Sequence, residues 1–181
     1  MKIHTKTGDY GKTKTITGAV VDKDNCLIQV NGDIDSLQSQ FDKVLYRLTS
    51  IPGYSVHISL IEDIQSLLWQ LGGEISGMKP KDKLSDYIID ETWVSILEQS
   101  IDDFGLDLKD FCRFRNPIAT DVNEARVRTR NLERTLTKYL RENNLRPDMY
   151  KFINRLSDYL FMLSVDIENK SSGCNNGTKN N

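Results

Sequence analysis

The chain has 181 residues, a length that fits one ordinary domain and excludes a large multidomain assembly. Hydrophobic residues make up 38% and charged residues 28%, the composition of a globular chain that can bury a core. No apolar run approaches the roughly 20 residues of a membrane span, and the first residues lack the apolar stretch of a signal peptide. We therefore expect a cytoplasmic protein without membrane segments.

The formal net charge is −2, yet the basic residues are concentrated in two regions. Nine of the ten arginines lie between Arg113 and Arg155, and four lysines lie among the first fourteen residues. The planar guanidinium of arginine pairs with phosphate oxygens in a bidentate manner, so this concentration predicts a local anion site. A nucleic-acid-binding face usually makes a whole domain basic, and the sequence pI of about 5.7 disfavours that class.

Cysteine and histidine are too sparse to indicate a metal centre or a disulfide framework. The three cysteines, Cys26, Cys112 and Cys174, are far apart, and only two histidines are present. We expect ordinary thiols and no metal bound by the protein itself. A metal ion would enter only with a substrate.

Residues 1–32 are rich in glycine, threonine and lysine and predict a loop or a short hairpin, with β-like stretches at 19–21 and 27–30. From Asp33, a plausible helix cap, apolar residues recur every three or four positions as far as Leu48. Four further amphipathic helices follow from the same periodicity. They are expected from Pro52 to Gly77, from Asp90 to Gly105, after Pro117, and from Pro147.

The predicted fold is an all-α, five-helix bundle of the ferritin-like up-and-down type, preceded by a non-helical arm. Residues 1–169 form the single domain, and residues 170–181 have the polar composition of a disordered tail. In the fifth helix, Phe161 and Val165 lie away from the main apolar stripe. This second apolar side indicates either central packing or an oligomer interface.

The N-terminal segment from Lys6 to Thr13 ends in Gly-Lys-Thr and nearly matches a phosphate-binding P-loop. Lys6 stands where the first glycine of that motif belongs, and no helix start follows the segment. Glycine backbone and Thr and Lys donors still suit a phosphate group, whereas a solvated basic turn is the alternative. Both interpretations remain open on this segment alone.

The fourth and fifth predicted helices carry polar residues beside their apolar stripes. Arg126, Arg130 and Glu133 project within about 60° of one another, which predicts an anion site or a structural salt bridge. Asn154 and Asp158 lie one turn apart in the fifth helix and need polar partners. The remaining basic residues of the fourth helix are expected to point to solvent; these are Arg128, Arg134, Lys138 and Arg141.

These segments together resemble the ATP:cob(I)alamin adenosyltransferases of the propanediol-utilisation type. The resemblance rests on four runs that are spread from the start of the chain to about residue 169. They are Thr5-Lys6-Thr7-Gly8-Asp9 with Gly11 and Thr13, Gly32 to Leu37, Ala125 to Arg134, and Phe152 to Phe161. The last run is the most specific.

The resemblance implies a homotrimer in which ATP lies between subunits, held by the N-terminal arm of one and helices four and five of the next. The residues implied to line the nucleotide are Thr5, Lys6, Thr7, Gly8, Thr13, Lys14, Lys23, Arg126, Arg130 and Asn154. Glu133 and Asp158 would support them. Asp35 would pair with Arg126 across the interface, and Phe111 would press on the lower face of the corrin.

In that family the cob(I) centre of cobalamin attacks the 5′ carbon of ATP and releases triphosphate, with Mg²⁺ on the phosphates. Arg130, Arg126, Phe111 and Asp35 would then act by positioning and by charge, without a protein nucleophile. An adenosylcobalamin-dependent enzyme is a candidate partner for the product. This agrees with the residues themselves, which provide two anion-binding regions and no obvious general base.

The chain departs from the family pattern at Asn131, at Gln38 and in the segment 112–117. The alternative function is therefore a catalytically impaired trimer that binds ATP or adenosylcobalamin and delivers it. An arginine-rich nucleic-acid binder is a third and disfavoured class.

Overall fold

The computed structural model describes residues 8–78, 87–106, 112–143 and 146–171. This part of the chain contains five helices: α1 (Cys26–Leu48), α2 (Ser55–Ile75), α3 (Glu91–Asp102), α4 (Pro117–Asn143) and α5 (Asp148–Ser171). Two short strands, β1 (Lys12–Lys14) and β2 (Val20–Asp22), precede them. The predicted all-α bundle with a non-helical N-terminal arm is confirmed.

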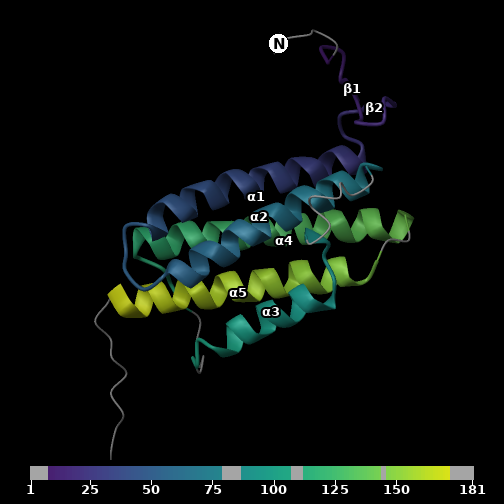
Figure 1. Ribbon diagram of the computed structural model, residues 1–181. Helices are drawn as coiled ribbons and strands as arrows, with labels where there is room; N and C mark the ends of the chain where they lie inside the picture. The colour runs from purple at the N-terminus through teal and green to yellow at the C-terminus, as the bar shows by residue number, and fades with distance from the viewer. Residues whose placement is uncertain (1–7, 79–86, 107–111, 144–145, 172–181) are drawn as a thin grey trace, which may run out of the picture.

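The helices form an up-and-down bundle in which each long helix runs alongside its neighbours (Figure 1). α1 packs against both α2 and α4, and α4 packs against α5. The short helix α3 packs against α5 on the side away from α4. α5 is therefore enclosed from two directions.

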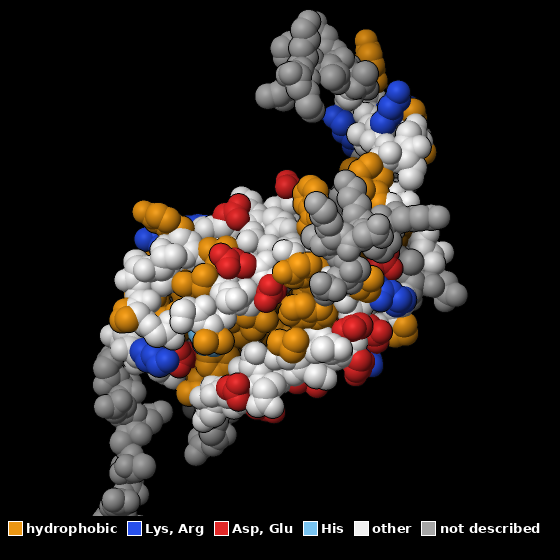
Figure 2. Space-filling model, in the orientation of Figure 1, with side chains coloured by type: hydrophobic (Ala, Val, Ile, Leu, Met, Phe, Trp, Pro, Cys, Tyr) orange, Lys and Arg blue, Asp and Glu red, His pale blue; other side chains and the backbone are white. Residues whose placement is uncertain are grey.

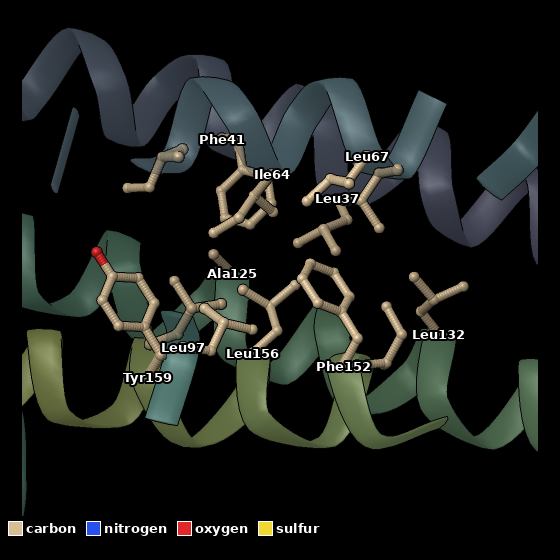
Figure 3. Close-up of a cluster of buried hydrophobic side chains, with 14 of the residues drawn as sticks. Leu37, Phe41, Ile64, Leu67, Leu97, Ala125, Leu132, Phe152, Leu156 and Tyr159 are labelled. Atoms are coloured by element: carbon tan, nitrogen blue, oxygen red, sulfur yellow. The ribbon is translucent and has the colours of Figure 1, made fainter. Parts of the chain in front are cut away.

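The core is built from the apolar stripes that the sequence periodicity indicates. Figure 3 shows side chains from all five helices pointing toward one another in the core of the bundle. Phe41 on α1, Ile64 on α2, Leu97 on α3, Leu132 on α4 and Phe152 on α5 have no exposed surface. Burying a side chain of this size contributes roughly 1.5 to 3 kcal/mol, so this shared core holds the helices together.

α1 begins seven residues before the predicted start at Asp33, and the predicted β-like stretch at 27–30 is helical instead. The side chain of Asn25 accepts the Leu27 backbone N–H at 3.0 Å and caps the helix. Val30 continues the apolar stripe and is fully buried. This burial outweighs the cost of about 1 kcal/mol for a glycine inside a helix at Gly32.

The N-terminal arm folds into an antiparallel hairpin, as the sequence allows. Lys12 pairs with Asp22, Thr13 with Val21 and Lys14 with Val20. The turn between the strands passes through a glycine with φ of +89°, a backbone conformation that favours glycine. The second strand matches the predicted stretch at 19–21 to within one residue.

The second apolar side of α5 is covered within the chain. Val165 is only 2% exposed, and α5 lies between α4 and α3. Of the two alternatives left open, central packing explains Val165. Phe161 is half-buried, and its neighbours belong to the candidate site described below.

α5 continues to Ser171, two residues beyond the predicted domain boundary. The rest of the predicted tail, residues 172–181, lies outside the described residues. Within the described ranges, none of the helices combines the length and the apolar composition that a bilayer crossing requires.

The half-buried histidine His57 on α2 contacts aromatic side chains of α5 and of the segment that follows α3. The ring of His57 stacks on Phe104 at 5.2 Å, and its Nδ1 lies 2.9 Å from the Tyr159 hydroxyl. Burial lowers the pKa of His57; the Asp166 carboxylate opposes this shift, and the Lys170 ammonium adds to it. The folded protein therefore favours the neutral imidazole.

We predict that stability declines as the pH falls below about 6.5, the ordinary histidine pKa. Between that value and the lowered folded pKa, the unfolded chain binds more protons than the folded chain, so the free energy of unfolding decreases as the pH is lowered. Urea unfolding at about pH 7.5 and 5.5 measures this slope. This dependence of the unfolding free energy on pH should largely disappear in His57→Gln and persist in the control His4→Gln. An unchanged pH dependence in His57→Gln would show that another group causes it.

Candidate functional site

Polar side chains on α4 and α5 meet along one edge of the contact between these helices. Glu133 on α4 accepts a hydrogen bond from the Asn154 side-chain amide on α5 at 3.1 Å. Arg130 lies one turn before Glu133, with its Nη1 3.8 Å from the Glu133 Oε2 atom. The structure therefore brings together three of the predicted site residues, Arg130, Glu133 and Asn154.

Arg126 is a half-buried cation without an acidic partner among the described residues. Its Nε donates to the Asn123 side chain at 2.8 Å, and its guanidinium lies 5.7 Å from the ring centre of Phe161. Its pKa is lowered, first by burial and then by the positive charge of Arg130. Because buried charges are normally paired, the terminal nitrogens of Arg126 are suited to receive an anion from outside the chain.

Three residues that the sequence reasoning did not assign to the site lie around this arginine. Phe161 contacts it, and the ring of Phe161 is met edge-on by Phe114 at 6.1 Å. The carboxylate of Glu168 on α5 accepts the backbone N–H groups of Arg115 and Asn116, each at 2.9 Å. This anchors the segment that enters α4. Only the apolar character of Phe161 was visible in the sequence.

Asp158, unlike Asn154, has no hydrogen bond or ion pair to α4 among the described residues. Asp158 is exposed, and its carboxylate pairs with the Nη1 atom of Arg155 at 3.2 Å. Arg155 also donates to the Asn154 Oδ1 atom at 3.1 Å. Asp158 thus reaches the cluster only through Arg155.

The described arm residues of the predicted site lie on or beside the hairpin. Gly8 packs close to Lys23, because a Cβ atom on Gly8 would lie 3.2 Å from the Lys23 Nζ atom. Thr13 and Lys14 are on β1. Thr5, Lys6 and Thr7 lie outside the described residues. Figure 2 shows basic side chains on the projecting hairpin, beside a face of the bundle that carries several acidic ones.

The hairpin projects from the N-terminal end of α1 and does not pack against α4 or α5 (Figure 1). Within one chain, the described contacts therefore leave the two halves of the predicted site apart.

A groove of about 830 Å³ lies between α1 and α2, next to the hairpin. Asp35 and Lys14 line it, and Trp69 at its wall is 71% exposed. The described contacts of Arg126 lie with Asn123 and Phe161, so Asp35 does not meet Arg126 within the chain. Their pairing remains a prediction about two subunits.

The prediction that Arg128 points to solvent is wrong. This side chain is half-buried, and its Nη1 donates to the carbonyl of Ser36 on α1 at 3.3 Å and also to the Ser36 hydroxyl. Its Nε donates to Glu124 at 3.0 Å. The flank of α4 that carries Arg128 faces α1, which helical projection of α4 alone does not reveal. The other three predicted solvent-facing residues, Arg134, Lys138 and Arg141, are exposed.

Phe111 lies outside the described residues. Within residues 8–78, 87–106, 112–143 and 146–171, no group of His, Cys, Asp or Glu side chains is arranged to hold a metal ion.

Replacement of the two neighbouring arginines should separate their roles in stability. Arg128→Ala removes hydrogen bonds between α4 and α1 and should lower the free energy of unfolding by about 1 kcal/mol. Arg130→Ala removes a long, half-exposed ion pair and should change the free energy of unfolding by less than about 0.5 kcal/mol. Urea denaturation measures both. Equal losses would contradict the different placements of the two side chains.

Comparison with known proteins covers nearly the whole chain. A family model described as "Cobalamin adenosyltransferase" matches residues 3–167. A corrinoid adenosyltransferase of Bacillus subtilis is 31% identical over 177 residues, spanning 96% of this chain and 89% of the relative. One from Citrobacter freundii is 34% identical over 168 residues, spanning 90% and 93%.

Solved structures of a PduO-type ATP:corrinoid adenosyltransferase from Lactobacillus reuteri share the fold. A variant in complex with ATP superposes with a TM-score of 0.76 at 28% identity, covering 93% of this chain and 96% of the other. Another variant, in complex with cobalamin and ATP, gives 0.75 at 27% identity, covering 94% and 93%. With a family match across residues 3–167 and relatives similar over nearly their full length, the chain belongs to the cobalamin adenosyltransferase family.

Proposed function

We propose that this protein transfers the 5′-deoxyadenosyl group of ATP to cob(I)alamin, forming adenosylcobalamin and releasing triphosphate. The observation that carries the proposal is Arg126, a half-buried guanidinium that has no acidic partner in the described part of the chain and lies near the like-charged Arg130. Two arginines one helical turn apart suit a polyphosphate. We take this polyphosphate to be ATP, because a family member has been solved in complex with ATP.

The reaction forms a cobalt–carbon bond and breaks the bond between C5′ and the triphosphate oxygen. Both electrons of the new bond come from cob(I), and the electron pair of the broken bond leaves with triphosphate. No protein nucleophile or general base is needed. The protein binds and orients the substrates and stabilises charge, and Mg²⁺ would reach the site on the phosphates.

Arg126 and Arg130 would stabilise the negative charge that grows on the departing triphosphate. Glu133 holds both Arg130 and the amide of Asn154, so it would fix their orientation toward the nucleotide. The N-terminal arm would supply further donors to the phosphates. The proposed arm residues are Thr5, Lys6, Thr7, Gly8, Thr13, Lys14 and Lys23.

We propose that the complete site forms between subunits of a homotrimer. Two observations on the described residues support this arrangement: the hairpin does not pack against α4 or α5, and Arg126 has no acidic partner although Asp35 is available in the groove between α1 and α2. The acidic side chains of Asp35 and Glu62 in the groove complement the basic edge of α4. The number three comes from the family resemblance.

Phe111 is proposed to press on the lower face of the corrin. The described residues that follow it are anchored, because Glu168 holds the backbone at the start of α4 and Phe114 packs on Phe161. We further propose that the enzyme works in the cytoplasm and passes adenosylcobalamin to an enzyme that depends on it.

The decisive experiment is anaerobic incubation with cob(I)alamin and MgATP, followed by the visible spectrum of the cobalt–carbon bond. We expect turnover by the natural chain. Arg130→Ala should lower kcat/KM for ATP by about 10-fold to 150-fold, because a charge-assisted hydrogen bond is worth roughly 1.5 to 3 kcal/mol. Binding of MgATP without turnover would instead favour the alternative of a delivery protein.

We predict a trimer in solution. Sedimentation equilibrium at micromolar concentration should give a mass near three times that of the chain. Asp35→Arg should weaken the assembly, because it would place a positive charge against Arg126 of the next subunit. A stable monomer of the natural chain would contradict both the assembly and the shared site.

A further inference from the structure

A second groove, of about 500 Å³, lies between α3, α4 and α5 and is lined mainly by charged and polar side chains. Two ion pairs along this groove join α3 to α5. The Lys151 ammonium lies 2.7 Å from a carboxylate oxygen of Glu91. The Arg155 Nε atom lies 2.8 Å from a carboxylate oxygen of Glu98. Both pairs are largely exposed, so each should contribute little to stability.

The two cations differ in what else they contact. Besides Glu91, the acidic group within ion-pair distance of Lys151 in the described chain is Asp148 on its own helix, at 3.8 Å, and the charge of Glu98 acts on Lys151 from farther away. Arg155 uses its Nη1 atom to bond the Asn154 Oδ1 atom at 3.1 Å and the Asp158 carboxylate at 3.2 Å. The pair from Glu98 therefore continues into the proposed nucleotide site, and the pair from Glu91 does not.

The neighbours of Asn154 fix which way its amide faces. A guanidinium can only donate hydrogen bonds, so Arg155 requires the amide oxygen. A carboxylate can only accept them, so Glu133 requires the amide nitrogen, which lies at 3.1 Å. One N–H and one lone pair of the Asn154 amide remain for a ligand. The bonds to Arg155 and Glu133 thus hold the Asn154 amide in one orientation, with this N–H and this lone pair presented to the ligand.

We infer that Glu98 on α3 is a positioning residue for nucleotide binding, acting through Arg155 on the amide of Asn154. This inference rests on the proposed function, in which Asn154 contacts ATP. Glu98 holds the guanidinium of Arg155 against the Asn154 oxygen. Without Glu98, Arg155 is free to turn toward Asp158 and solvent, and the Asn154 amide keeps only its bond to Glu133. The short helix α3 thereby takes part in a site otherwise built from α4, α5 and the arm.

The test compares Glu98→Gln with the matched control Glu91→Gln. Each variant removes one carboxylate charge from an exposed pair between α3 and α5, so thermal stability should change equally little. Titration calorimetry of MgATP without corrinoid should show the dissociation constant rising about threefold to tenfold in Glu98→Gln, the range expected when one hydrogen bond to the ligand is weakened. It should rise less than about twofold in Glu91→Gln.

Two further measurements show whether the effect passes through Asn154. In an Asn154→Ala background, Glu98→Gln should no longer change the MgATP dissociation constant. In the protein labelled with ¹⁵N-asparagine and free of nucleotide, the Asn154 side-chain amide signal should shift in Glu98→Gln and stay unchanged in Glu91→Gln. The Asn154→Ala variant identifies that signal by its loss.

Equal effects of Glu98→Gln and Glu91→Gln on both the dissociation constant and the amide signal would overturn the inference. So would an undiminished effect of Glu98→Gln in the Asn154→Ala background. The proposed function fails separately, if the natural chain does not form adenosylcobalamin from MgATP and cob(I)alamin. The amide signal reports on the inference even in that case, because it needs no turnover.

Discussion

Ala125 and Leu132 on α4 share a fully buried core with Phe152 and Leu156 on α5 (Figure 3). Successive helical residues are rotated by about 100°, so the residues that follow the buried ones lie at the edge of this contact. Arg126 follows Ala125, and Glu133 follows Leu132 in this way. The apolar packing therefore sets the spacing of the polar groups, and the site has the stiffness of the core beneath it.

The fold could be predicted from the sequence because its signals are local. Helical periodicity, prolines and caps gave five helices, and the predicted starts of α3 and α4 lie within a residue of the observed ones. The start of α1 was missed because residues 1–32, which include Gly32, were predicted as a loop or short hairpin and Asp33 as the helix cap. The contact that overrides this local preference is the burial of Val30, which depends on helices far along the chain.

The site was only partly predictable, for the same reason. Arg130, Glu133 and Asn154 meet as expected, because their positions follow from two helical faces. The contact of Arg128 with Ser36 and that of Glu168 with the start of α4 each join residues more than fifty positions apart. Neither has a periodic signature in the sequence. Candidate binding residues can be found from sequence patterns, whereas the residues that hold them in place are found only from the fold.

The early start of α1 determines how the hairpin is presented. At about 1.5 Å per residue, the seven extra helical residues carry the hairpin roughly 10 Å farther along the bundle axis. The connection is a rigid spacer, with the Asn25 cap at its end and a hydrogen bond from the Lys23 N–H to the Gly11 carbonyl beyond it. A rigid spacer loses less conformational entropy on docking than a flexible tether. Inserting or deleting one residue in 26–33 would also rotate the hairpin by about 100° about the helix axis, so the length of this segment governs both the reach and the direction of the arm.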